Sequence, residues 1–293
     1  MHTHHDHAHP HHTPTITNLN RRLLVGAGLN ILYVLVEAGV GLYTGSMALL
    51  ADAGHNLSDV AGLLLSLLAF RLARVKASNT FTYGLRKSTV LASLINAVLL
   101  LLAVGAILVE SVQRFRQPEP VPGGLVAWVA ALGIVINAAS AGLFFRDRNH
   151  DLNIRGAYLH LLADALVSVG VVASGLLIGY TGWFWLDPAM GLVVAVVILL
   201  GTWRLLTDSL RLTLDGVPAG ISLPDVQRAI GNVPGVAGVH HIHVWAMSTT
   251  ETALTAHLHL IPDLSAAQIA ALKHEVRHQL EHLGIQHATL ETD

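Results

Sequence analysis

Long runs of apolar residues, separated by short polar segments, dominate the chain up to about residue 212. A helix that crosses a lipid bilayer needs about 20 mostly apolar residues, each adding about 1.5 Å. Six segments meet this requirement, and glycine, proline or charged residues separate them. We therefore predict a membrane bundle of six α-helices at residues 22–44, 47–70, 88–111, 123–145, 153–180 and 184–208.

The pattern changes after residue 212. The sequence DGVPAG, residues 215–220, is typical of a linker, and the remaining residues follow the order helix, strand, strand, helix, strand. Residues 236–246 and 252–261 alternate between apolar and polar positions. This order predicts a compact α+β domain of the ferredoxin-like type, with both helices on one face of the sheet. The other face is then available as an interface.

Two serines mark the expected helix starts in this domain. Ser222 is followed three residues later by Asp225, and Ser265 by Gln268. A serine with an acidic or amide residue three positions on is a signature of a helix N-terminus. The second helix should bury one apolar stripe, formed by Leu272, Val276, Leu280 and Leu283.

Composition supports an integral membrane protein. Of the 293 residues, 53% are hydrophobic and 12% are charged, and the mean hydropathy is +0.56. The formal net charge of -2 does not suggest nucleic acid as a partner. The chain has no cysteine, so a bound metal must accept nitrogen and oxygen ligands, and 19 histidines make this possibility serious.

Seven histidines lie within the first twelve residues, interrupted by Asp6 and Pro10. The segment is either a native, weakly chelating tail or the remnant of a purification tag, and the interruptions favour a native tail. We expect a disordered tail at residues 1–20, a membrane domain at 21–212 and a cytoplasmic domain at 213–293.

Basic residues set the expected orientation in the inner (plasma) membrane. They precede the first helix and occupy the loops after the second and fourth helices, whereas the opposite loops hold only Arg114 and Arg116. By the positive-inside rule, both termini lie in the cytoplasm. The residues on the positive side are Arg21, Arg22, Arg71, Arg74, Lys76, Arg86, Lys87, Arg146, Arg148 and Arg155.

Four polar residues within the apolar helices form the main candidate site. His55 and Asp59 are four residues apart in the second helix and therefore project from one face, and His160 and Asp164 repeat this spacing in the fifth helix. A single pair would equally serve as a hydrogen bond between packed helices. Two matched pairs supply two nitrogens and two oxygens, a donor set that suits tetrahedral Zn²⁺. Two carboxylates also neutralise one divalent cation.

Further polar residues accompany the pairs. Asn30 and Glu37 lie in the first helix, and Asp52 and Asn56 flank the pair in the second. Such residues favour a polar pathway through the membrane, although each alone is more typical of a contact between helices.

Several motifs together resemble the cation diffusion facilitator family of metal/proton antiporters. They are SMALLADAGHNLSDVAG at residues 46–62, HLLADALVSVG from His160, Lys87 after FTYG, and LDGVP before the α+β domain. The resemblance implies a homodimer that exports divalent metal from the cytoplasm in exchange for protons by alternating access. It implies that His55, Asp59, His160 and Asp164 form the transport site, in the form that prefers Zn²⁺ and often accepts Cd²⁺ or Co²⁺.

The same resemblance assigns roles outside the membrane. It implies a charge interlock formed by Lys87 and Asp215, although a surface lysine and a linker aspartate are the simpler interpretation. It also implies a regulatory binuclear zinc site in the cytoplasmic domain, onto which His240, His257 and Asp293 map best and His287 less well. Some relatives carry another metal site after the second helix, but residues 71–83 contain no His, Asp or Glu, so we expect none there.

Elementary chemistry supports proton exchange. Metal binding requires neutral imidazole and ionised carboxylate, so protons and Zn²⁺ compete for the same lone pairs. The chain contains no Walker A motif, which favours an ion gradient over a nucleotide as the energy source. We expect no enzymatic activity and no organic cofactor.

Two alternatives remain open. HEVRH at residues 274–278 matches the HExxH signature of zinc metalloproteases, but the buried stripe of the same helix predicts that both histidines face water. The chain could also be a membrane-anchored zinc sensor or buffer. The leading hypothesis is a secondary transporter that exports Zn²⁺, with Cd²⁺, Co²⁺ or Ni²⁺ as further candidate substrates, and so confers metal resistance.

Overall fold

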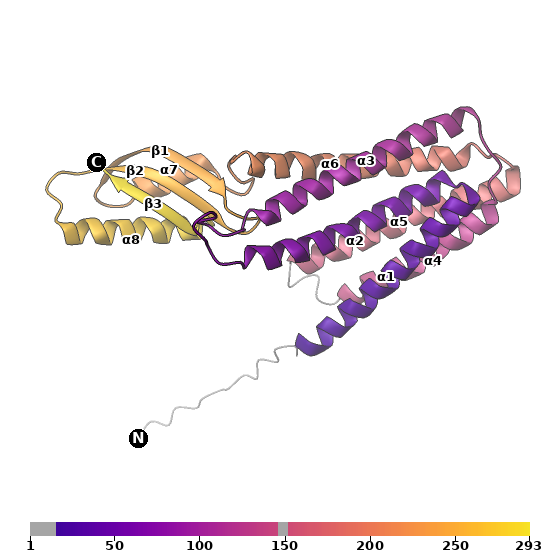
Figure 1. Ribbon diagram of the computed structural model, residues 1–293, viewed down its shortest axis with the longest axis horizontal. Helices are drawn as coiled ribbons and strands as arrows, with labels where there is room; N and C mark the ends of the chain where they lie inside the picture. Colours follow the sequence, from indigo (N-terminus) through magenta and orange to yellow (C-terminus); the bar gives the residue numbers. More distant parts are fainter. Residues whose placement is uncertain (1–15, 146–151) are drawn as a thin grey trace, which may run out of the picture. The chain divides into compact units, whose positions relative to one another are not determined.

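The computed structural model (Figure 1) describes the backbone of residues 16–145 and 152–293 and the side chains of residues 28–142, 145 and 158–293. The histidine-rich segment and the basic residues Arg146 and Arg148 lie outside these ranges. The apolar part forms six helices close to the predicted ranges. They are α1 (Ile16–Thr44), α2 (Met47–Ala73), α3 (Ser88–Arg116), α4 (Gly123–Phe144), α5 (Leu152–Thr181) and α6 (Leu186–Thr213).

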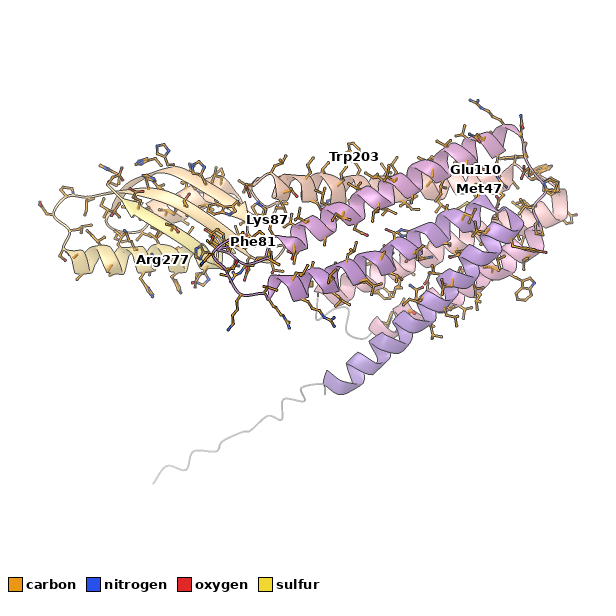
Figure 2. All side chains as sticks on the ribbon, in the orientation of Figure 1. Met47, Phe81, Lys87, Glu110, Trp203 and Arg277 are labelled. Atoms are coloured by element: carbon orange, nitrogen blue, oxygen red, sulfur yellow. The ribbon has the colours of Figure 1, made fainter. Side chains whose placement is uncertain are left out.

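Helices α2 to α6 each contain a segment long and apolar enough to cross a membrane. Helix α1 has 29 residues. The part whose side chains are described, Gly28–Thr44, is apolar but shorter than the spans of the other five helices. Large apolar side chains on these helices are exposed, among them Leu63 on α2. Trp203 on α6 is another and is labelled in Figure 2. Such exposure suits a lipid environment, and the prediction of a multi-pass membrane protein is confirmed.

The chain divides into two compact units, of which the first comprises residues 1–53 and 114–191. Its core packs α1 and the first turns of α2 against α4 and α5, around Tyr33, Leu49, Val126 and Val171. Helices α4 and α5 lie side by side along their length (Figure 1). A Cβ on Gly175 of α5 would lie 2.8 Å from the backbone nitrogen of Ala127, so glycine permits this close approach.

Asp187 connects the start of α6 to the start of α2. An aspartate followed by a proline, as in Asp187 and Pro188, is typical of a helix N-cap with proline at the first helical position, which predicts that Asp187 caps α6. That interpretation is wrong, because α6 already begins at Leu186. The carboxylate of Asp187 instead accepts hydrogen bonds from Ser46 Oγ at 2.5 Å and from the backbone nitrogen of Met47 at 2.6 Å. Asp187 thus satisfies free donors at the N-terminus of α2.

The second unit comprises residues 54–113 and 192–293 and includes the α+β domain. The order helix, strand, strand, helix, strand is confirmed. Strands β1 and β2 pair antiparallel, and β3 joins the other side of β2 in parallel. The elements are α7 (Leu223–Gly231), β1 (Val236–Ala246), β2 (Thr252–Leu260), α8 (Ala266–His282) and β3 (His287–Thr292).

Both helices of this domain cover the same face of the sheet. Val226 and Ile230 of α7 join Leu272, Val276 and Leu280 of α8 in one core with the inward residues of the strands. The predicted buried stripe of α8 is therefore confirmed, with Leu283 partly buried beside it. The opposite face of the sheet carries no helix in the described part of this domain.

The two predicted helix starts differ in detail. Ser265 and Gln268 form a reciprocal capping box at the start of α8, as the sequence predicted. Ser222 occupies the N-cap position of α7, but its side chain makes no capping hydrogen bond there.

Candidate metal centres

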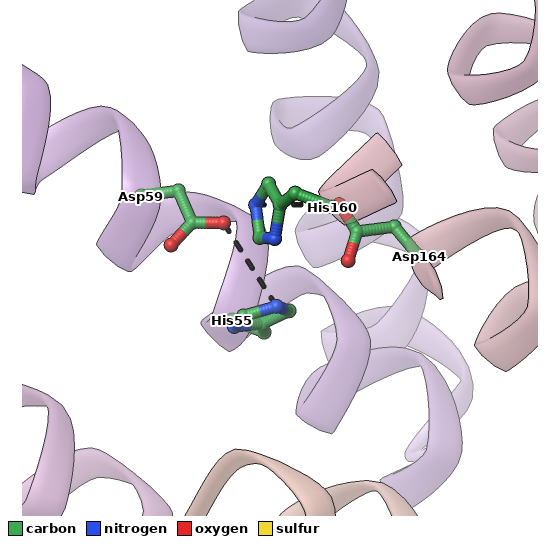
Figure 3. A group of neighbouring side chains, drawn as sticks. All are labelled: His55, Asp59, His160 and Asp164. Atoms are coloured by element: carbon green, nitrogen blue, oxygen red, sulfur yellow. Dashed lines mark ion pairs between the residues drawn. The ribbon is translucent and has the colours of Figure 1, made fainter. Parts of the chain in front are cut away.

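The two membrane pairs lie as helical spacing predicts, each on its own helix. On α2, His55 Nε2 lies 3.8 Å from a carboxylate oxygen of Asp59. On α5, His160 Nε2 lies 3.6 Å from a carboxylate oxygen of Asp164. Figure 3 draws both pairs, with dashed lines for these two contacts. Each pair therefore presents an imidazole nitrogen and a carboxylate oxygen close enough to bind one ion together.

Other polar residues of the membrane helices are buried in the first unit. Tyr33 donates a hydrogen bond of 2.7 Å to Glu37, whose side chain is fully buried within α1. Ser168 on α5 donates a hydrogen bond of 3.1 Å to the carboxylate of Asp52 on α2, and both of these residues are also buried. Buried carboxylates in a membrane helix are costly unless they are paired or protonated, and they mark functional regions. The hydrogen bond between Asp52 and Ser168 was not foreseen, because it joins helices distant in sequence.

A second cluster lies on the uncovered face of the sheet. One ligand atom from each of His240, His257 and Asp293 can be chosen so that all three lie within 4.8 Å of one another. His240 Nε2 lies 3.2 Å from Asp293, and His257 Nε2 lies 3.5 Å from Glu291. We call His240, His257 and Asp293 the cytoplasmic cluster. It takes one residue from β1, one from β2 and one directly after β3.

The strand register explains this convergence. His240 is the partner of His257 in the antiparallel ladder, so their side chains stand on the same face. Beyond this pair the register shifts, because His241 and Ile242 together oppose the single residue Ala256. This β-bulge places His241 in the left-handed region with φ of 49°.

The bulge adds a third imidazole that sequence alternation did not assign to the cluster. The ring of His241 lies 5.2 Å from that of His240 and 5.3 Å from that of His257, between centroids. Alternation cannot reveal such a neighbour, because an extra residue in one strand changes which side chains share a face. His241 is therefore the residue that the sequence missed.

His287 lies away from this cluster. It begins β3, whereas Asp293 follows the end of β3, and six residues of strand extend about 20 Å. The ring of His287 instead meets Tyr83 edge-on, with centroids 6.1 Å apart. The structure thus brings together three of the four residues mapped onto the cytoplasmic site.

The connection between α2 and α3 is joined to the α+β domain by charged groups. Lys87 forms an ion pair with Asp215, as the charge interlock requires. Arg86 forms a second pair with Glu251, at 2.8 Å. The backbone nitrogen of Thr249 also donates a hydrogen bond to Thr89 on α3, at 3.0 Å. These contacts couple the start of α3 to the sheet.

The HExxH match lies on an open surface. His274, Glu275 and His278 are all exposed on α8, opposite its buried stripe. The Glu275 carboxylate accepts a hydrogen bond from Gln279 on the same helix, at 2.7 Å. A metalloprotease would need a third ligand and a substrate cleft beside these histidines.

Family profiles match both the membrane helices and the α+β domain. The family profile described as the cation efflux transmembrane domain matches residues 23–213, and that of the cation efflux protein cytoplasmic domain matches residues 218–293.

Named relatives match over almost the full length. The chain is 38% identical to the zinc transporter ZitB of Escherichia coli, over 98% of this chain and 92% of that protein. It is 35% identical to the cadmium, cobalt and zinc/H(+)-K(+) antiporter of Bacillus subtilis, over 89% and 85% respectively. It is 33% identical to the metal cation efflux system protein CzcD of Cupriavidus metallidurans, over 94% and 87%. This chain therefore belongs to the cation efflux family of membrane transport proteins, the cation diffusion facilitators.

Proposed function

We propose that this protein exports Zn²⁺ from the cytoplasm in exchange for protons, as a secondary transporter with alternating access. His55, Asp59, His160 and Asp164 hold the transported ion. Cd²⁺, Co²⁺ and Ni²⁺ are possible further substrates, because imidazole and carboxylate ligands accept several divalent ions. The relatives named for zinc, cadmium and cobalt support this range.

One observation carries the proposal. An imidazole nitrogen lies 3.8 Å from a carboxylate oxygen in the pair on α2, and the pair on α5 repeats this arrangement at 3.6 Å (Figure 3). Ligands of a tetrahedral Zn²⁺ lie about 2.0–2.2 Å from the ion and hence about 3.3 Å from one another. Small rotations of these side chains bring the two ligand atoms of each pair to that separation. The two carboxylates then offset the charge of the ion inside the membrane.

The ligands also provide the coupling to protons. An imidazole must be neutral and a carboxylate ionised to bind Zn²⁺, so protonation expels the metal. An ordinary imidazole exchanges its proton near pH 6.5, within the range found on either side of a membrane. A site that opens alternately to the two sides therefore loads metal where protons are scarce and releases it where they are abundant. No nucleotide is needed for this cycle.

The cytoplasmic cluster serves as a regulatory zinc site in this proposal. Its ligands are exposed or only partly buried, so the ion exchanges with the cytosol. The sheet face that carries them lies opposite the helices and the apolar core in the described part of the domain, which supports its use as the interface of a homodimer. Both termini then lie in the cytoplasm, as the distribution of basic residues supports.

A membrane-anchored sensor or buffer is the second candidate, and the cytoplasmic cluster is the observation that favours it. Such a protein would bind zinc in the α+β domain without moving it across the bilayer. The two membrane pairs then have no role, whereas in a transporter they are essential.

Zinc uptake into proteoliposomes under an imposed pH gradient distinguishes the two candidates. We expect Asp59→Ala to abolish uptake, because it removes a charged ligand. The matched control is Asp208→Ala, which removes an aspartate of α6 that pairs with Arg211 and belongs to neither metal centre. The control should transport at nearly the normal rate. Equal uptake by the Asp59→Ala variant and the unmodified protein would refute the transport site.

A further inference from the structure

The exposed side of α8 carries alternating imidazole and carboxylate groups. His274, Glu275, His278, Glu281 and His282 are all exposed, whereas the other side of the helix is buried in the domain core. These five residues lie at spacings of three and four, so they neighbour one another along the helix surface. The row has no part in the transport site or in the cytoplasmic cluster.

Two histidines of this row are close enough to share an ion. The rings of His278 and His282 have centroids 4.6 Å apart and planes at 87°. Their spacing of four residues places the Cβ atoms about 5–6 Å apart. Two imidazole nitrogens on one tetrahedral Zn²⁺ lie about 3.3 Å apart, since each Zn–N bond is about 2.0–2.1 Å. Rotation about the side-chain bonds of two exposed residues is sufficient to reach this separation.

The position on the helix also favours a cation. His282 is the last residue of α8, where the helix dipole is negative and stabilises positive charge. Glu281 lies one turn from His278 and adds an anionic group beside the pair. Lys273 and Arg277 form the neighbouring row of the helix and oppose binding. Arg277 is labelled in Figure 2. The effect of both residues is reduced, because charges exposed to solvent are screened by salt.

We propose that His278 and His282 together bind one divalent transition-metal ion, such as Zn²⁺, Ni²⁺ or Cu²⁺. The site is separate from the cytoplasmic cluster. Two protein ligands leave the remaining positions to water, so the ion exchanges readily. The HExxH match thus overlaps a metal-binding helix surface through His278, without forming a protease.

The test is equilibrium dialysis of the detergent-solubilised chain against Ni²⁺ at pH 7.5. All samples lack residues 2–12, because that segment contains other histidines. His282→Gln should bind one ion fewer than the parent. The matched control, His274→Gln, removes an exposed histidine of the same row and should bind as many ions as the parent.

A spectroscopic measurement identifies the ligands. With one equivalent of Cu²⁺ added to a background that lacks the imidazoles of both other centres (His55→Ala, His160→Ala, His240→Ala and His257→Ala), the parent should give an EPR signal of two equatorial nitrogens that His282→Gln reduces to one or none. Unfolding temperatures in EDTA should be the same for all variants, since both positions are exposed. Unchanged Ni²⁺ stoichiometry in His282→Gln, or loss of the ion in His274→Gln instead, would overturn the proposal.

Discussion

The two candidate metal centres of this protein are built in opposite ways. In the membrane, each half of the proposed site is a pair four residues apart on one helix, α2 or α5. In the cytoplasmic cluster, each ligand comes from a different part of the sheet, and His240 and Asp293 are 53 residues apart along the chain. The helical pairs depend on local geometry, whereas the cluster depends on strand register.

This difference bears on how each centre tolerates change. An α-helix places residues i and i+4 together wherever it forms, so the membrane pairs survive changes elsewhere in the bundle. The cytoplasmic cluster requires the correct register and the bulge at His241. It also requires the core beneath the sheet to hold the strands in place. Three predictions test this contrast.

The largest effect is expected when a carboxylate of the membrane site is neutralised. Asp164→Asn keeps the shape of the side chain but removes one of the two charges that offset the metal ion. Zinc uptake should fall at least about 100-fold, because an uncompensated charge in the membrane costs several kcal/mol.

The comparison variant is Asp293→Asn in the cytoplasmic cluster. It should retain most of the maximal uptake rate and change only its dependence on cytosolic zinc. Initial rates in proteoliposomes at several zinc concentrations provide the measurement. A comparable loss of maximal rate in both variants would show that the two centres are not functionally distinct.

A change in the core beneath the cytoplasmic cluster should have the next largest effect. Leu258 on β2 is fully buried next to His257, and Leu258→Ala should destabilise the α+β domain by about 2–5 kcal/mol. Hydrogen exchange of the β2 amides in the full chain measures this loss. His259→Ala, on the exposed face of the same strand, should stay within about 0.5 kcal/mol of the parent. Equal exchange in the two variants would contradict the assigned core.

The smallest effect concerns the bulge. His241→Ala and His241→Gly both remove the imidazole, but only glycine adopts a φ of 49° without strain. The glycine variant should be more stable than the alanine variant by about 1 kcal/mol, measured by the same hydrogen-exchange method. The two should bind zinc equally at the cytoplasmic cluster. A more stable alanine variant would mean that His241 does not hold the left-handed conformation.

Much of the architecture could be predicted because its signals are local. Apolar length predicted the helices, and the alternation of residues predicted β1 and β2. The buried stripe of Leu272, Val276 and Leu280 predicted how α8 packs and why its histidines are exposed. The position of Asp187 was misjudged for the opposite reason. Its partners, Ser46 and Met47, lie about 140 residues earlier, so a local capping rule assigned it to the wrong helix.

The amino-acid sequence by itself determined the membrane helices, the two His–Asp pairs and the order of elements in the α+β domain. Helical period and apolar length act over a few residues, so neighbouring side chains are sufficient to specify them. Only the tertiary structure decided that His241 joins His240 and His257 while His287 stands beside Tyr83. Strand register and a single bulge set those positions, and both arise from pairing between residues far apart in the chain.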